Sequence, residues 1–328
     1  MDIGQKLTEQ ELARLEKRIF AVYQEAYNGL DATILEYFSK FSERDKDMKA
    51  QLDAGKITEE HYRQWRIAQI GRGKRFEALR DQVAERMTNA NATAVAYVND
   101  ATPGIYSLNR NFAAYTIEQV AGDVGFDIWD EQTVKRLIAE QPELMPYYPE
   151  KRALNRGIDL AYGKKQITAS VTSSILQGRS IKGMADDLQS RITTMNRDSA
   201  IRTARTAVTG AQNAGRLDSY YAAEKMGIKC RKQWMATLDG RTRHSHAMLD
   251  GEIADNDKKF SNGCRYPGDP NGPPSEIYNC RCTLVSEIEG IDTSDGQRRA
   301  RNQATGRNEL IENMSYAEWA GWKKKNGR

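Results

Sequence analysis

The amino-acid sequence predicts a mainly α fold: a long helical hairpin and a helical middle region, followed by a small α+β C-terminal module with a long ordered loop. Two observations predict the helices. Apolar residues recur at three- and four-residue steps through the first hundred residues, and again from residue 151 to Met226. A third observation predicts the module: after Gly227 the period shortens, and two strand candidates enclose a stretch rich in Gly, Pro, Asn and Asp.

Composition limits the classes of protein to which the chain can belong. The chain has 328 residues and a formal net charge of +4, which is too small to indicate nucleic-acid binding by itself. Hydrophobic residues make up 39% and no apolar run is long enough for a membrane span, so we expect a soluble protein, made in the cytoplasm, with no membrane partner. Four cysteines are too few for a disulfide framework in a chain of this length.

Residues 1–100 are predicted to form the helical hairpin. Thr8 and Glu11 fit a capping box at the start of the first helix. Gly55 ends this helix, and Thr58 followed by Glu59 starts the second one, which we expect to continue to residue 98.

Residues 101–150 are predicted to form an aromatic-rich connector. Pro103-Gly104 and later Gly and Pro residues break the helical pattern, and aromatic side chains are frequent. The connector is either a docking surface or a loop that packs on the helical core.

Residues 151–288 begin with helices and end in the small module. One helix ends at Gly178, Ser180 begins the next, and a long helix from Asn196 ends at Gly227. The strand candidates are 228–237 and 280–288, and the loop between them has too few apolar residues to form a core alone. Residues 289–328 are predicted to be a polar, mobile tail.

The residues suited to chemistry are concentrated between Trp234 and Cys282. Trp234 is followed by Asp239, Arg241-Thr242-Arg243 and His246, and the stretch closes on Asn279-Cys280-Arg281-Cys282. With the preceding Arg-Thr-Ala-Arg-Thr run, these motifs over about residues 150–288 resemble the Mu F-like phage head morphogenesis proteins, or minor head proteins.

This resemblance implies a virion component inside the capsid. Members of the family associate with the portal vertex during head assembly, and contact with packaged or ejected DNA is suggested for some of them. The expected partners are therefore portal protein, capsid or scaffold proteins and, through non-specific contacts, double-stranded DNA. The stretch after Cys282 is too short for an added catalytic domain, so we expect no enzyme.

Four residues of this stretch are candidate zinc ligands. His246, Cys264, Cys280 and Cys282 carry the imidazole and thiolates that zinc prefers, and a metal would cross-link a loop that lacks a core. The family pattern keeps the histidine and the Cys-x-Cys but not Cys264, for which Asp250 is a substitute. The alternative is structural: buried cysteines act as small apolar residues and the histidine bonds to Asp239 or Asp250.

The remaining polar residues suggest a structural network. Arg241 and Arg243 are expected to pair with Asp239 and Asp250 and to order the loop, with DNA phosphate contact as the alternative. The predicted network consists of Trp234, Asp239, Arg241, Arg243, Asp250 and Asn279.

Two further functions remain open. His244, His246, Asp239 and Asp250 could hold a divalent metal that activates water against a phosphodiester. Non-specific DNA contact could use Arg202, Arg205, Arg216, Lys323, Lys324 and Lys325.

Overall fold

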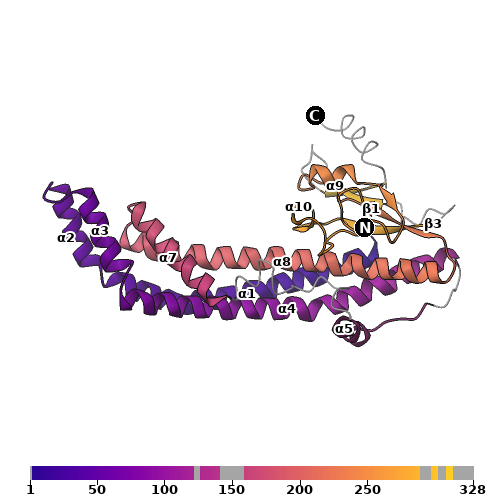
Figure 1. The fold of residues 1–328 in the computed structure, drawn as a ribbon, viewed down its shortest axis with the longest axis horizontal. Helices are drawn as coiled ribbons and strands as arrows, with labels where there is room; N and C mark the ends of the chain where they lie inside the picture. The colour runs from indigo at the N-terminus through magenta and orange to yellow at the C-terminus, as the bar shows by residue number, and fades with distance from the viewer. Residues whose placement is uncertain (1, 122–125, 141–158, 289–296, 302–307, 313–328) are drawn as a thin grey trace. The chain divides into compact units, whose positions relative to one another are not determined.

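A computed structural model describes residues 2–121, 126–140, 159–288, 297–301 and 308–312, and the predicted mainly α fold with a small C-terminal sheet is confirmed (Figure 1). The helices are α1 (Ile3–Ser39), α2 (Ser42–Asp53), α3 (Glu59–Ile70), α4 (Lys74–Ala121), α5 (Glu131–Glu140), α7 (Leu160–Leu176), α8 (Ile181–Lys225), α9 (His244–Met248) and α10 (Pro274–Ile277). The strands are β1 (Cys230–Met235), β2 (Ile253–Ala254), β3 (Thr283–Ile288), β4 (Gln297–Arg301) and β5 (Asn308–Glu312). Among these helices, none combines the length and the apolar character needed to cross a bilayer.

The chain forms two compact units, and each of the long helices α1, α4 and α8 contributes to both. The helical unit comprises Glu16–Tyr97 and Glu150–Ile201; the sheet unit comprises Met1–Leu15, Val98–Pro149 and Arg202–Arg328. The predicted segments 1–100 and 151–288 therefore do not coincide with the compact units, because helices run across their boundaries.

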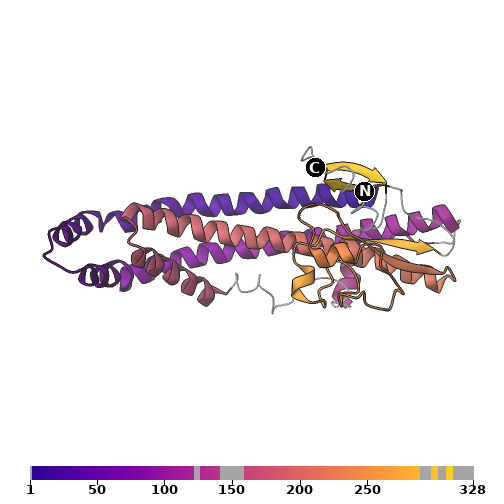
Figure 2. The same ribbon diagram turned by 90° about the horizontal axis from the view of Figure 1, so that it is seen from above.

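The helical unit is built from the amphipathic faces that the sequence predicted. Its core contains Ile19, Tyr23, Ile34, Phe38, Ile70, Phe76, Val83 and Met87. The predicted start at Thr58 is confirmed, since its side chain accepts a hydrogen bond from His61 N at 3.1 Å and α3 begins at the next residue. The predicted hairpin is divided further: α2 and α3 form a short antiparallel pair, seen in both views (Figure 2), between the long helices α1 and α4.

The predicted capping box at Thr8 is wrong. The helix begins earlier, at Ile3, because the Asp2 carboxylate accepts a hydrogen bond from Gln5 N at 2.7 Å and so caps the first turn. Thr8 lies inside α1, where its hydroxyl donates to Gly4 O and accepts from Asn109 Nδ2, both at 2.8 Å. Thr8 thus joins α1 to α4 within the sheet unit.

The predicted connector starts too early. Residues 101–121 continue α4, which contains Pro103 in its interior. Proline cannot donate to the carbonyl four residues before it, and the Thr102 hydroxyl donates to that carbonyl, Asn99 O, at 3.4 Å instead. Tertiary packing thus maintains a helix that the Pro103-Gly104 pair would interrupt in an isolated peptide. Residues 141–150 of the predicted connector lie outside the described residues.

Small residues on α8 allow α4 to approach it closely in the sheet unit. The side chains of Ala204, Ala207, Ala211 and Ala214 are buried. A Cβ atom added at Gly215 would lie 2.4 Å from Tyr106 O and 3.1 Å from Arg110 N, so only glycine fits this crossing. The predicted helix from Asn196 is confirmed but begins earlier, at Ile181. Gly227, which was predicted to end it, follows the helix with a φ of 89°.

The C-terminal sheet has the strand order β2-β1-β3, and both pairings are antiparallel. In the β1–β3 pair, Trp234 lies opposite Leu284 and Lys232 lies opposite Ser286. Cys230, Lys232 and Trp234 are buried on one face of β1. Figure 1 shows this sheet beside the C-terminal part of α8, which carries the residues that hold it.

Part of the predicted mobile tail is ordered as a hairpin. β4 and β5 pair antiparallel, with Arg299 opposite Leu310 (Figure 2). Lys323, Lys324 and Lys325, predicted to contact DNA, lie outside the described residues.

Candidate functional site

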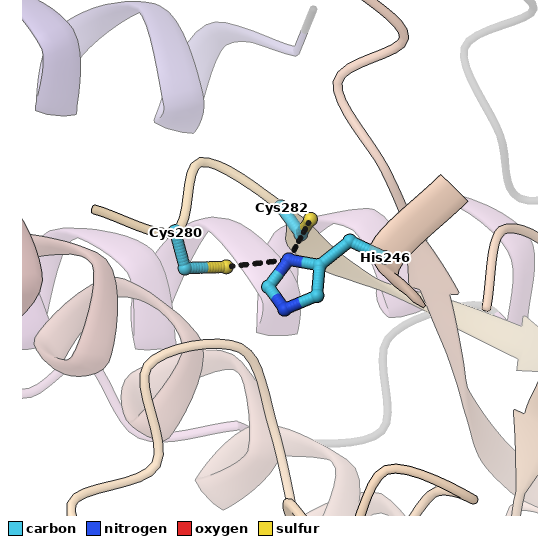
Figure 3. Close-up of side chains that lie close together, drawn as sticks. All are labelled: His246, Cys280 and Cys282. Carbon is cyan, nitrogen blue, oxygen red and sulfur yellow. Dashed lines mark hydrogen bonds between the residues drawn. The ribbon is translucent and has the colours of Figure 1, made fainter. Parts of the chain in front are cut away.

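The candidate site is a buried cluster of His246, Cys280 and Cys282 in the sheet unit. His246 lies on the short helix α9, and the two cysteines lie in the segment that leads into β3 (Figure 3). The imidazole Nδ1 is 3.6 Å from Cys280 Sγ and 3.4 Å from Cys282 Sγ. Within the described residues, this is the group of histidine, cysteine and acidic side chains whose ligand atoms lie close enough together to hold a metal ion.

The other ring nitrogen of His246 faces a carboxylate. Nε2 lies 3.2 Å from Glu276 Oε2, although the two atoms are not aligned for a regular hydrogen bond. Both groups are largely buried, and Glu276 also accepts a bond from Ser245 Oγ at 3.1 Å. A carboxylate beside Nε2 favours the tautomer with its proton on Nε2, which leaves the Nδ1 lone pair facing the two sulfur atoms.

Aromatic rings surround the histidine. The indole ring of Trp234 packs edge-on against the His246 ring, with 5.4 Å between the centroids, and against Phe260 at 5.2 Å. Trp234 is completely buried. The cluster is therefore shielded from water on this side, and electrostatic interactions inside it are strengthened.

The surroundings shift the pKa values of the two thiols in opposite directions. Burial raises the pKa of the Cys280 thiol well above its ordinary value, and its hydrogen bond with Cys282 raises it further. Burial also raises the pKa of Cys282, but the hydrogen bonds with Cys280 and His246 together lower it more, so that its net pKa is below the ordinary value.

Cys264 does not belong to the cluster. It is buried, but its sulfur lies outside the group formed by His246, Cys280 and Cys282. It packs under Gly272, where an added Cβ atom would come within 2.5 Å of its sulfur. Burial raises its pKa to about 12, as expected for an inert core thiol. The prediction that Cys264 is a fourth ligand is therefore wrong, and its role is packing.

Asp239 and Arg243 contact partners other than those predicted. Asp239 pairs with Arg281 and accepts the Arg241 backbone N–H at 2.9 Å, whereas the Arg243 side chain donates to the Tyr278 carbonyl. Burial raises the pKa of Asp239, but the hydrogen bonds from Arg281 and Arg241 N lower it below its usual value.

Asp250, the proposed substitute ligand, also has another role. Its carboxylate accepts the Ala236 backbone N–H at 2.8 Å and stabilises the turn after β1. Asp250 is therefore not a ligand in the cluster.

The structure does not bring together the four residues that could hold a catalytic divalent metal. His244 is exposed, and of His244, His246, Asp239 and Asp250 only His246 belongs to the metal-capable group found in the described residues. Asp239 is engaged by Arg281, and Asp250 by backbone. These four side chains therefore do not present the converging oxygen and imidazole ligands of a catalytic divalent-metal site.

The predicted DNA-binding arginines have two different environments. Arg202 and Arg205 are exposed on α8. Arg216 is buried: its guanidinium makes two 2.7 Å bonds to Asp2, one of 3.2 Å to Asn109 Oδ1 and one of 3.0 Å to Leu284 O. The prediction that Arg216 contacts DNA is therefore wrong, because its charge is neutralised within the sheet unit.

Polar residues of α8, which we did not predict as site residues, hold the Cys-x-Cys segment in place. Thr206 Oγ1 accepts the Asn279 N–H at 3.2 Å, and Thr209 Oγ1 donates to Cys280 O at 2.8 Å. The Asn213 amide donates to Cys282 O at 3.2 Å and accepts the Leu284 N–H at 2.8 Å. The signal was present in the sequence, since residues 206, 209, 213 and 216 recur at three- and four-residue steps on one helix face.

Asn279 completes this attachment through its backbone. Its φ of 54° is in the left-handed region, which asparagine tolerates better than most residues, and it turns the chain sharply before Cys280. Asn279 therefore contributes to this part of the structure through its backbone conformation and through the bond from its backbone N–H to Thr206.

The site lies within a region that matches a known family. Residues 165–285 match the family model described as Phage Mu protein F like protein. The minor head protein GP7 of Bacillus phage SPP1 is 27% identical over 320 residues, which cover 95% of this chain and 94% of that protein.

Two other relatives match shorter parts. The NAD(+)–arginine ADP-ribosyltransferase EFV of Enterococcus faecalis is 31% identical over 157 residues, which are 47% of this chain and 31% of that enzyme. The uncharacterized protein YqbB of Bacillus subtilis is 31% identical over 126 residues, which are 36% of this chain and 40% of that protein. No solved structure is significantly similar to the chain. Residues 165–285, which contain the whole His-Cys-Cys cluster, are therefore similar to the Phage Mu protein F like family.

Proposed function

We propose that this chain is a minor head protein: a structural component of a phage head that associates with the portal vertex during head assembly and remains inside the capsid. The observation that carries the proposal is the match to minor head protein GP7, which extends over nearly the full length of both proteins. The match includes the long helices as well as the 165–285 domain, so it supports a shared role for the whole chain.

The geometry supports a structural role for the domain. Asp239, Asp250 and Arg243 each stabilise the loop between β1 and β3 through contacts inside the domain. A hydrolytic site requires a metal-bound or activated water that substrate can reach, whereas His246, Cys280 and Cys282 are buried. The alignment with the ADP-ribosyltransferase covers only 31% of that enzyme, so its activity does not extend to this chain by similarity.

Contact with packaged DNA is the second part of the proposal. Arg202 and Arg205 lie one helical turn apart on α8, and both are exposed. Phosphate contacts of this kind carry no sequence information and fit a protein that meets DNA of any sequence inside a head.

Portal association is tested by co-expression with the portal protein encoded in the same phage genome, followed by capture of a tag on the portal. We expect the chain to be retained, and an unrelated portal protein carrying the same tag serves as the control. Free monomer that never associates with the portal would contradict the proposal.

A separate assay tests the expectation that the protein does not cleave DNA. Purified protein is incubated with DNA and manganese or magnesium, alongside the His246→Ala variant. We expect no turnover by either protein. Metal-dependent cleavage that disappears in His246→Ala would show instead that the cluster belongs to an enzyme.

A further inference from the structure

We propose that His246, Cys280 and Cys282 bind one zinc ion, through Nδ1 of the imidazole and the two thiolates, and that Glu276 orients the histidine from the opposite side of its ring. The three ligand atoms lie within 4.8 Å of one another and all three side chains are buried. This proposal does not depend on the function proposed above.

The distances are those of a tetrahedral site. Around a zinc ion with Zn–N of about 2.0 Å and Zn–S of about 2.3 Å, a nitrogen and a sulfur ligand lie about 3.5 Å apart. In this structure Nδ1 lies 3.6 Å from Cys280 Sγ and 3.4 Å from Cys282 Sγ (Figure 3). Both N–S edges of such a tetrahedron are therefore already formed by the protein.

Hydrogen bonding alone does not explain this arrangement. A ring nitrogen has either one proton or one lone pair in the ring plane, so Nδ1 can form one good hydrogen bond. Two sulfur atoms at similar distances from Nδ1 compete for that one bond, whereas a single cation placed among the three atoms would contact all of them.

The environment of the other ring nitrogen has the form found around zinc-bound histidines. Such histidines usually donate their second N–H to a carboxylate or a carbonyl, which fixes the tautomer and the ring orientation. His246 Nε2 lies 3.2 Å from Glu276 Oε2. The Glu276 carboxylate is in turn held by Ser245, which lies next to His246 on α9.

The charge balance also suits a divalent cation. Zinc binding releases the two thiol protons, and the two resulting thiolates neutralise the +2 charge of the ion in a buried position. No fourth protein ligand joins the group in the described part of the chain, so a non-protein ligand would complete a tetrahedral shell.

The site would supply a cross-link that the fold lacks. The chain between β1 and β3 contains only α9, the two-residue strand β2 and the four-residue α10 as regular elements. Zinc would tie α9, near the start of this loop, to residues 280–282 at its end. The ion would therefore lock the loop around Trp234.

The direct test is the metal content of the full-length protein after reconstitution with zinc and removal of unbound metal. We expect one zinc per chain in the parent and in Cys230→Ala and Cys264→Ala, which remove buried thiols outside the cluster. We expect its loss in Cys282→Ala and His246→Ala. A parent without zinc, or equal zinc in all variants, would overturn the proposal, and zinc loss in Cys264→Ala would overturn the ligand set.

A second measurement uses the unaltered protein and so does not depend on how the variants fold. Cobalt added to the chelated protein is expected to give the ultraviolet charge-transfer band of thiolate ligation, and chelation is expected to expose two additional thiols to alkylation. The proposal is refuted if no such band develops, or if mass spectrometry finds Cys280 and Cys282 joined as a disulfide in the freshly purified protein.

Discussion

The buried guanidinium of Arg216 and the carboxylate of Asp2 form a two-pronged ion pair, with both N–O distances at 2.7 Å. The pair connects the start of α1 to α8, and the same guanidinium donates to Leu284 O in β3. Burial raises the pKa of Asp2, but the charge and hydrogen bonds of Arg216 lower it more, so the carboxyl is held below its usual pKa. Because Arg216 also donates to Asn109 of α4, it links α8 to α1, α4 and β3 within the sheet unit.

Replacing Arg216 tests this link. Arg216→Met leaves the Asp2 charge without its partner in a nearly buried position, which costs about 3 kcal/mol or more in the free energy of unfolding. Urea unfolding measures the loss, and Arg202→Met, an exposed arginine on the same helix, is the matched control. Equal stability of the two variants would show that the pair contributes little.

Lys232 is expected to stabilise the sheet unit in a similar way to Arg216. Its buried ammonium donates to three backbone carbonyls, Asn256 O at 3.1 Å, Arg265 O at 2.8 Å and Lys258 O, and so gathers the loop that follows β2. Lys232→Met leaves these carbonyls without their donor and should lower the free energy of unfolding by about 2 to 3 kcal/mol.

The accompanying measurement is amide hydrogen exchange. We expect faster exchange between residues 256 and 265 in Lys232→Met, and unchanged exchange in Lys259→Met, which removes an exposed ammonium from the same loop. If exchange in this loop is the same in the parent and in Lys232→Met, the ammonium does not organise the loop.

Acid should destabilise the loop through Asp269. Burial raises the pKa of this carboxyl, but hydrogen bonds from the Arg265 side chain, Arg265 N and Asn271 N together lower it below its ordinary value of 3.8. Because the folded-state pKa is depressed, the stabilisation is complete above the unfolded pKa and is lost as pH falls through the folded pKa. We predict that Asp269→Asn is less stable than the parent at neutral pH and that the difference narrows below about pH 4. A stability difference independent of pH would contradict this assignment.

The exposed arginines of α8 are expected to contribute to DNA binding. Arg202→Glu with Arg205→Glu should weaken binding to duplex DNA and reduce the slope of log affinity against log salt by about 2, one for each lost phosphate contact. Lys258→Glu with Lys259→Glu reverses the same number of exposed charges elsewhere and is the control. Affinity and slope that fall equally in both variants would show only a non-specific effect of net charge.

Local signals predicted several of the element ends correctly. Thr58 accepts the N–H of His61, Ser180 accepts the N–H of Gly183 at 3.0 Å, and Gly178 and Gly227 both have positive φ after their helices. These features depend on a few neighbouring residues, so a single sequence contains them. The two strands of the module were predicted for the same reason, since β1 alternates buried and less buried side chains.

Long-range partners could not be predicted in this way. The sequence places Arg241 and Arg243 close to Asp239, and only the fold determines that Arg281 pairs with it. In the sequence Arg216 belongs to a basic stripe, and only the fold places Asp2, at the start of α1, against its guanidinium. Pro103 locally predicts a break in the helix. The packing that maintains α4 comes from distant segments, so the local sequence does not reveal it.

The candidate site was predicted in part. His246, Cys280 and Cys282 do converge, as their concentration in one stretch suggested, but Cys264 does not join them and Glu276 was not foreseen. Spacing along the chain does not determine where a loop side chain points when the loop has little regular structure.

The central claim, that the chain is built into a phage head, is tested most directly by quantitative mass spectrometry of heads purified from a lysate of the phage that encodes it. The account predicts that the chain sediments with intact heads, in a fixed ratio to the portal protein, and resists protease until the heads are opened. Heads that contain portal and capsid proteins but not this chain would contradict it.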